Sequence, residues 1–225
     1  MEKSPSRAIS RTDIVVALYI FLTIITEVMG AKTFPIITIG SFQLSSSVAI
    51  FILPIVYSLS DIMLEVHGKK RARGLVYLGI GTIVLLMLYT LLATSLPPTS
   101  RFAPSEPAYD AIFQFSIRIS IASITAFALS ELLDLAIFSK LRERMKGKAL
   151  WLRNNVSNFV GFFVDSAVFL TIAFYALDKS LANNFSFILG LLIPYWLLKC
   201  FMSIIETPFV YAGVKWLRRD VSNQE

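Results

Sequence analysis

Six long apolar stretches alternate with short, more polar connections along this chain of 225 residues. They run approximately over residues 14–33, 46–66, 73–95, 111–139, 155–177 and 187–211. Each is close to or longer than the roughly 20 residues that a helix needs to cross the hydrocarbon core of a bilayer. The pattern therefore predicts an all-α polytopic membrane protein, in which six transmembrane helices form a single helical bundle over residues 1–225.

Prolines and glycines indicate how the longer connections are built. Pro35 and Gly40 interrupt the first connection, so the backbone from Phe34 to Leu44 is expected to be irregular and to dip into the protein, where such backbone is tolerated. The third connection contains four prolines that are expected to preclude a regular helix there, Pro97, Pro98, Pro104 and Pro107. The fourth apolar stretch is long for a simple crossing and is expected to be tilted.

Composition and charge support a membrane location and predict an orientation. Only 16% of the residues are charged and the mean hydropathy is +0.68, whereas soluble domains carry about 25% charged residues. Sixteen Lys and Arg residues lie in the N-terminal tail, the second and fourth connections and the C-terminal tail, but the other three connections hold only Arg101 and Lys179. By the positive-inside rule both termini are cytoplasmic. The net charge of +6 is thus interpreted as a topology signal and not as a nucleic-acid-binding surface.

Charged residues inside the apolar stretches point to a solute path. A charge near the bilayer centre costs about 2.5–3.5 kcal/mol on insertion scales, so such residues face protein or water. This composition is typical of a transporter and not of a passive anchor. Glu65 and Lys32 lie near the ends of their stretches and are interpreted as interface residues. The acids are Glu27, Asp61, Glu65, Glu131, Asp134, Asp165 and Glu206, and the bases are Lys32, Arg118 and Lys199.

Four of the stretches carry a polar stripe with a carboxylate, because residues three, four or seven apart share one helix face. Together the stripes predict one shared central cavity. For the serines alone, close helix packing is an equally simple explanation, and for the acids, ion pairing with Lys199 or Arg118 is the alternative. The stripes comprise Pro54, Tyr57, Ser58, Asp61 and Glu65; Ser116, Ser120, Ser123, Phe127, Ser130 and Asp134, with Glu131 beside them; Asn154, Asn158, Gly161 and Asp165; and Tyr195, Lys199, Ser203 and Glu206.

The sequence shows no constellation typical of an enzyme, a metal site or a cofactor site. His67 is the only histidine and lies in a basic turn, where a solvated role is expected. Gly68-Lys69-Lys70 lacks the preceding glycine of a phosphate-binding loop. Cys200 is the only cysteine, so a disulfide within the chain is impossible. Neither a cofactor nor a metal is therefore predicted.

An ordered set of motifs resembles the queuosine precursor transporter family, a vitamin-uptake-like family of integral membrane proteins. The motifs cover the second, fourth, fifth and sixth stretches, about two-thirds of the chain, in the expected order. They are Pro54 to Asp61 with Glu65; His67 to Arg73; Arg118 to Arg142 with Ser123, Ala126, Phe127, Ser130, Asp134 and Phe138; Arg153 through Asp165 to Phe169; and Lys199 with Glu206, Thr207, Pro208 and Tyr211.

This resemblance implies import of 7-cyano-7-deazaguanine, or of its aminomethyl relative, across the plasma (inner) membrane for the synthesis of queuosine or archaeosine in tRNA. The expected partners are this small molecule and the lipid bilayer, with no direct contact with nucleic acid. The oligomeric state is left open, with a homo-oligomer as one of the states considered. A carboxylate suits a guanine-like edge, since it accepts both adjacent N–H donors. The predicted substrate-binding residues are Asp61, Arg118, Ser130, Glu131, Asp134, Asn158, Asp165, Tyr195, Lys199 and Glu206.

Three other functions fit the same residues. The first is a substrate-binding membrane subunit that separate proteins energise, since this chain has no nucleotide-binding motif. The second is a membrane enzyme that uses Asp134 and Asp165 as paired carboxylates. The third is a cation or proton exchanger.

Overall fold

Six helices long and apolar enough to cross a membrane dominate the computed structural model, which confirms the predicted helical bundle. The structure describes residues 9–30, 32–39, 42–113 and 117–221. In chain order the elements are α1 (Arg11–Met29), β1 (Thr33–Ile39), β2 (Phe42–Ser47), η1 (Val48–Phe51), α2 (Leu53–His67), α3 (Lys69–Ser95), η2 (Ala103–Ser105), α4 (Glu106–Phe113), α5 (Ile117–Arg144), α6 (Leu150–Phe174) and α7 (Leu181–Val221).

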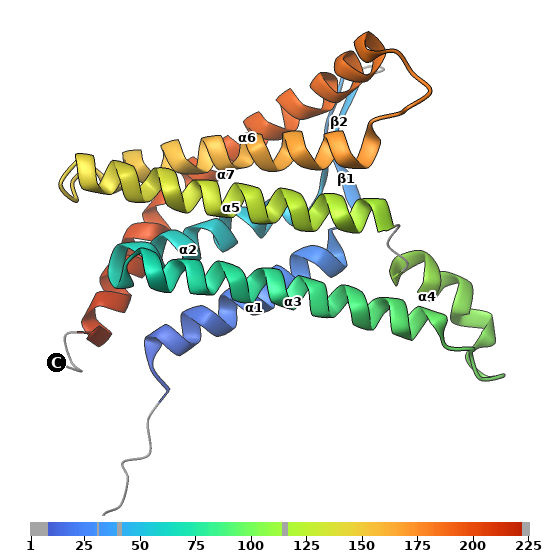
Figure 1. Ribbon diagram of the computed structural model, residues 1–225, viewed down its shortest axis with the longest axis horizontal. Coiled ribbons are helices and arrows are strands. Elements are labelled where there is room, and N and C mark those ends of the chain that lie inside the picture. The colour runs from blue at the N-terminus through green and yellow to red at the C-terminus, as the bar shows by residue number, and fades with distance from the viewer. Residues whose placement is uncertain (1–8, 31, 40–41, 114–116, 222–225) are drawn as a thin grey trace, which may run out of the picture.

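The first connection is a β-hairpin, so the expectation of irregular backbone there was wrong for the described residues. β1 and β2 pair antiparallel from Thr33 opposite Ser47 to Ile39 opposite Phe42. The pairing shifts between Pro35 and Ile37, where proline has no N–H to give to the ladder. The hairpin projects from the part of the bundle that contains the end of α1 and the start of α5 (Figure 1).

The third connection contains more helix than its prolines predicted. A 3-10 turn, η2, begins at Ala103, and α4 begins at Glu106 with Pro107 in its first turn. Proline is tolerated at this position because the first N–H groups of a helix have no partner within the helix. The predicted fourth stretch, 111–139, is therefore covered by two described helices, α4 and α5, and Ser116 lies outside the described residues.

Helix α7 is longer than the apolar stretch 187–211 and includes two internal prolines, Pro194 and Pro208. A proline inside a helix removes one backbone hydrogen bond and crowds the preceding turn. Figure 1 shows α7 passing diagonally behind α6 and ending beside the start of α1. The helix thus connects opposite ends of the bundle.

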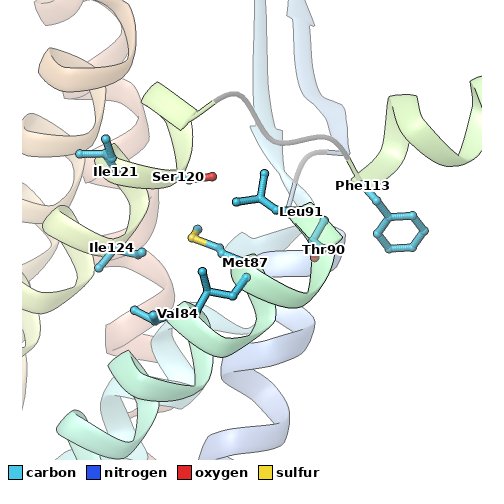
Figure 2. Close-up of a pocket in the computed structure, with 9 residues that line it drawn as sticks. Val84, Met87, Thr90, Leu91, Phe113, Ser120, Ile121 and Ile124 are labelled. Carbon is cyan, nitrogen blue, oxygen red and sulfur yellow. The ribbon is translucent and has the colours of Figure 1, made fainter. Parts of the chain in front are cut away.

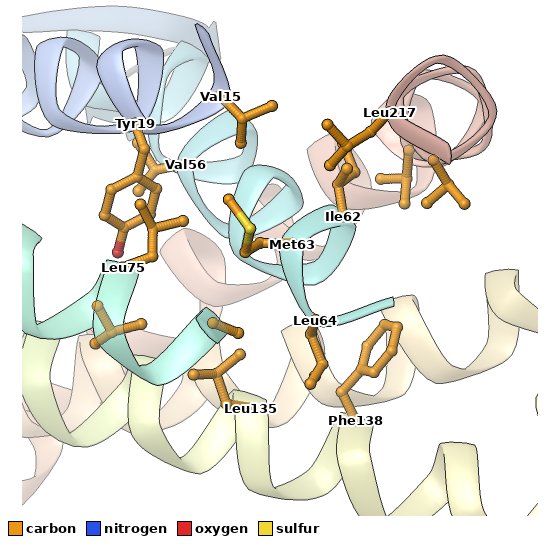
Figure 3. Packing of buried hydrophobic residues seen from close by; sticks show 14 of the residues in the cluster. Val15, Tyr19, Val56, Ile62, Met63, Leu64, Leu75, Leu135, Phe138 and Leu217 are labelled. Carbon is orange, nitrogen blue, oxygen red and sulfur yellow. The ribbon is translucent and has the colours of Figure 1, made fainter. Parts of the chain in front are cut away.

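The centre of the apolar core is α2, most of whose residues are buried. Met63 and Leu64 of α2 share one buried cluster with Val15 of α1, Leu135 of α5 and Leu217 of α7. Figure 3 shows Leu217 beside Ile62 of α2. Small residues allow close helix contacts around this core. A Cβ atom on Gly213 would lie 2.5 Å from the Ile62 side chain, and one on Gly79 would lie 2.8 Å from the Tyr19 ring.

The basic connections lie together at one end of the bundle. Figure 1 places the α2–α3 and α5–α6 connections, the start of α1 and the end of α7 at this end. The hairpin, α4 and the α6–α7 connection lie at the opposite end. The charge asymmetry found in the sequence is therefore an asymmetry between the two ends of the molecule, which we call the basic end and the hairpin end.

Candidate functional site

Helices α2, α5, α6 and α7 bring most of the predicted site residues into the interior. Asp61, Glu131, Asp134 and Asn158 have no exposed surface, and Glu206 is 7% exposed. The side chains of Asp61 and Asp134 are close enough to interact electrostatically across α2 and α5. The polar stripes expected on these helices thus meet inside the bundle.

Many polar atoms in this interior have no hydrogen-bond partner among the described residues. Nine such buried side-chain atoms belong to six residues, which we call the acceptor cluster: Ser58, Asp61, Asp134, Asn154, Asn158 and Glu206. Seven of the nine are carboxyl or carboxamide oxygens. A buried polar atom left unpaired costs about 1–3 kcal/mol. A group of them is therefore expected to serve a ligand that donates hydrogen bonds.

Contacts between helices join the members of the acceptor cluster. The Nδ2 atom of Asn158 donates to the Ser203 hydroxyl at 3.0 Å, which connects α6 to α7. Ser58 lies near Glu206, and Ser157 of α6 lies near Asp134. The cluster is thus a single site formed by four helices.

A close approach of α6 to α2 and α5 positions this site. A Cβ atom on Gly161 would lie 3.3 Å from the Tyr57 ring and 3.4 Å from Cβ of Asp134. The Tyr57 hydroxyl and the Ser130 hydroxyl are 2.5 Å apart. The Tyr57 ring also meets the Phe162 ring edge-on, with 4.8 Å between the ring centroids. Ser130, a predicted contact, therefore orients an aromatic wall beside Asp134.

Glu131 is already hydrogen-bonded within the protein. Its Oε1 accepts from the Tyr19 hydroxyl at 3.2 Å, and its Oε2 accepts from the Ser60 hydroxyl at 3.1 Å. These bonds join α5 to α1 and α2. Because both oxygens have partners, Glu131 is less available to a ligand than Asp134.

Lys199 and Asp165 form an ion pair between α7 and α6. The Nζ of Lys199 is 2.7 Å from Oδ2 of Asp165 and donates to the Ser166 hydroxyl at 3.2 Å. Lys199 is 1% exposed and Asp165 is 15% exposed. The Tyr195 ring centroid is 4.5 Å from Nζ. The sequence left the partner of Lys199 open, and the structure assigns it to Asp165.

Arg118 lies outside the acceptor cluster, at the hairpin end. Its exposed side chain donates to the backbone carbonyls of Ile172 and Tyr175, where α6 ends. The last carbonyls of a helix have no partner within the helix, so Arg118 satisfies two of them. Glu27, the acid expected near this end, accepts from the Ser123 hydroxyl at 2.9 Å. A solute contact of Arg118 stays a prediction.

Glu65 is a central ion-pair residue, in contrast to its interpretation as an interface residue. Its carboxylate is 5% exposed and lies 2.7 Å from Arg153 of α6, 2.9 Å from Arg218 of α7 and 3.3 Å from Arg142 of α5. The signal in the sequence was its position four residues after Asp61 on the same stripe, opposite basic residues of three other helices. This four-residue Glu65 cluster separates the acceptor cluster from the basic end.

The cavity shown in Figure 2 is lined by none of these acids. It is lined by residues of α3, α4 and α5, among them Met87, Leu91, Phe113 and Ile124, and has a volume of about 200 Å³. Its lining is almost entirely apolar, so it does not match the polar central cavity predicted from the stripes. Among the described residues, no three His, Cys, Asp or Glu side chains are grouped so as to hold a metal ion.

Known proteins share this sequence pattern. The family described as "Putative vitamin uptake transporter" matches residues 47–213. A "Probable queuosine precursor transporter" of Bacillus subtilis is 28% identical over 184 residues, which cover 81% of this chain and 78% of that protein. Proteins of Haemophilus influenzae, "Probable queuosine precursor transporter", and of Escherichia coli, "Queuosine precursor transporter", are each 26% identical. These two alignments cover 65% and 56% of this chain, and 60% and 53% of the two relatives.

No solved structure matches the chain. The family match includes α2, α3, α5, α6 and the greater part of α7, and thus every member of the acceptor cluster. The names of the relatives describe transporters, which sets aside the membrane enzyme considered from the sequence. Since the match covers residues 47–213 of 225, the chain belongs to the vitamin uptake transporter family, as a multi-pass membrane protein and not an enzyme.

Proposed function

We propose that the protein imports a queuosine precursor, 7-cyano-7-deazaguanine or its aminomethyl relative, across the plasma membrane. The observation that carries this proposal is the acceptor cluster, whose unpaired atoms are mainly carboxyl and carboxamide oxygens. A 7-deazaguanine presents two adjacent N–H donors on its guanine-like edge and a third on its five-membered ring. The names of the three relatives agree with a solute of this class.

The acids of the site have distinct parts in this proposal. Asp134 and Glu206 have unpaired oxygens and accept the paired N–H donors of the solute, as carboxylates accept fork-shaped donors elsewhere. Asn158 and Asn154 accept or donate at the remaining polar edges. The rings of Tyr57 and Phe162 provide an apolar wall for the flat base. The other predicted contacts, Asp61, Ser130, Glu131, Asp165, Tyr195 and Lys199, line or support this interior.

Equilibrium binding of a base panel to purified protein tests the proposal. The panel contains both deazaguanines, guanine, and adenine as the control that lacks the paired donors. The deazaguanines are expected to bind, and adenine is not. Equal binding of adenine would contradict recognition of the guanine-like edge, and the absence of deazaguanine binding would contradict the proposed function itself.

The Asp134→Asn variant is expected to bind deazaguanine about ten- to a hundredfold more weakly. Replacing a charged acceptor by a carboxamide removes roughly 1.5–3 kcal/mol from the hydrogen bonds to the solute. The matched control is Asp178→Asn, because Asp178 is 75% exposed at the hairpin end. Wild-type affinity in Asp134→Asn protein that remains in the membrane would remove Asp134 from the site.

The basic end is proposed to face the cytoplasm, with both termini on that side. Cysteines placed at Lys70 or Lys146 should then be shielded from an impermeant thiol reagent in intact cells, and a cysteine at Ser105 should react. All three positions are exposed, and the only native cysteine, Cys200, is buried. Reaction at Lys70 and Lys146 with protection at Ser105 would reverse the orientation.

Uptake by this chain alone distinguishes the proposal from an externally energised importer. In a host that lacks queuosine precursor transport, expression of this single chain is expected to restore uptake. Uptake that appears only when other subunits are added would favour the substrate-binding subunit instead. Cation flux without any base present would favour the exchanger.

A further inference from the structure

Asp61 and Asp134 form a pair of fully buried carboxyl groups without a basic partner. Both side chains have no exposed surface, and none of their four oxygens has a partner within strict hydrogen-bond geometry among the described residues. Their nearby polar groups include each other and, for Asp134, the Ser157 hydroxyl. The ion pairs of the buried interior are formed by Glu65 and Asp165 and do not include either acid. Two uncompensated charges at this depth would each cost several kcal/mol.

The side chains around Asp61 and Asp134 do not compensate the negative charge of the two carboxylates. Arg153 acts electrostatically on Asp61, but its guanidinium is committed to Glu65 and to the carbonyls of Lys148 and Gly147. Lys199 is committed to Asp165. The titratable groups that interact with one or both acids are Tyr19 of α1, Tyr57 of α2, Glu131 of α5 and Arg153 of α6. Asp165 of α6 lies near Tyr57 and Glu131, and Glu206 of α7 lies near Ser58.

Further unpaired side chains mark the same place as a binding site. Ser58 lies one helical turn from Asp61, and its buried hydroxyl has no partner among the described residues. Asn154 lies one turn from Ser157, the neighbour of Asp134, and both polar atoms of its fully buried carboxamide are likewise unpaired. Residues three apart lie on the same face of a helix, so Ser58 lies on the face of Asp61 and Asn154 on the face of Ser157. The pair is therefore part of a larger polar region inside the bundle.

7-Cyano-7-deazaguanine is neutral, so it donates hydrogen bonds but brings no charge to offset the acids, unlike its aminomethyl relative, whose amine is protonated at neutral pH. A metal ion is not favoured, since no three acidic, His or Cys side chains are grouped around a common point in the described chain. Adjacent carboxyl groups instead share a proton, because they repel each other when both are ionised. We propose that Asp61 and Asp134 hold one proton between them and that this proton enters the cell together with the solute.

This inference rests on the proposed function for the solute, and it makes the protein a proton-coupled importer. The pair begins with both carboxyl groups ionised and takes up one proton, the one that they then share, when the site opens to the outer side. The proton and the solute occupy the closed site together, and both leave when the site opens to the cytoplasm. One proton moves in the same direction as one solute molecule, and the two carboxyl groups return to their starting state.

Infrared difference spectroscopy of purified protein tests the proton site without any solute. The carbonyl stretching band of buried, protonated carboxylic acid is expected in wild-type protein, and Asp61→Asn is expected to remove part of it. Asp178→Asn, at an exposed acid, is the control and should leave the band unchanged. A band unaltered by both Asp61→Asn and Asp134→Asn would overturn the shared proton.

Proteoliposomes test the coupling, with the membrane potential clamped at zero. An inward proton gradient of one pH unit should accumulate 7-cyano-7-deazaguanine about tenfold in wild-type vesicles, because one proton accompanies each molecule of this neutral solute. Asp61→Asn should remove this accumulation, and Asp61→Glu, which retains an acid, should keep at least part of it. Loss of accumulation in Asp61→Glu as well as Asp61→Asn, despite folded protein that binds solute, would overturn the role of the carboxyl group.

The two proposals fail in different ways. Wild-type protein that binds no deazaguanine contradicts the proposed solute, and the infrared band then decides on the proton site by itself. Wild-type protein that binds deazaguanine but shows no response to the pH gradient contradicts the proton coupling alone. Accumulation driven by a sodium gradient in place of the pH gradient would likewise overturn it.

Discussion

Lys199→Met protein is expected to lose about 3–5 kcal/mol of its free energy of unfolding and most of its transport. The substitution leaves Asp165 without the cation that lies 2.7 Å away, and removing one member of a buried ion pair leaves the other charge uncompensated. Thermal unfolding in detergent and solute uptake by vesicles measure the two effects. Lys140→Met is the matched control, because Lys140 is exposed at the basic end.

A double variant separates the structural role of Lys199 from a direct role in transport. Lys199→Met combined with Asp165→Asn removes both charges and is expected to recover much of the lost stability. If Lys199 also contacts the solute, as we expect, the double variant remains defective in uptake. A folded and fully active Lys199→Met single variant would contradict both roles.

Glu65→Gln is expected to destabilise the protein by about 3–5 kcal/mol, because it leaves three guanidinium groups close together without their shared carboxylate. The more deeply an arginine of this cluster is buried, the more its loss should lower the free energy of unfolding. Arg153 is fully buried, whereas Arg218 is 57% exposed, so Arg153→Gln should cost more than Arg218→Gln.

The midpoint of thermal unfolding in detergent measures this series. Glu143→Gln is the control, since Glu143 is an exposed acid of α5 at the same end of the molecule. Equal effects of Glu65→Gln and Glu143→Gln would contradict the central position of the Glu65 cluster. If Arg218→Gln lowered the midpoint of thermal unfolding more than Arg153→Gln, the ranking by burial would be contradicted.

The membrane helices were predictable because a stretch of about 20 mainly apolar residues can be recognised from the sequence alone, without knowledge of tertiary contacts. The hairpin was missed although its sequence contained the signal. Thr33–Ile39 is rich in Thr, Ile and Phe, which favour strands, but Pro35 and Gly40 were given more weight as interruptions. α4 was missed for a related reason, since a proline that prevents a helix in its interior is compatible with its first turn.

The helix faces of the site were predictable, but the pairing of individual side chains was not. Spacing along each helix put Asp61, Asp134, Asn158 and Glu206 on polar stripes, and the structure brings these stripes together. Which acid pairs with Lys199 depends on the rotation and depth of α6 relative to α7, which one sequence does not specify. The same holds for Glu65, whose three partners come from helices far apart in the sequence.

The two prolines of α7 enclose the polar stripe of that helix. Lys199, Ser203 and Glu206 all lie between Pro194 and Pro208, where the carbonyls of Gly190 and Ile204 lack the N–H donors that other residues would supply. Helices bend most readily at such points. The segment between the prolines can therefore move as one rigid unit between two hinges, while the Arg218–Glu65 contact holds its extension at the basic end. Such a movement would turn the α7 side of the solute site toward either face of the membrane without unwinding any other helix.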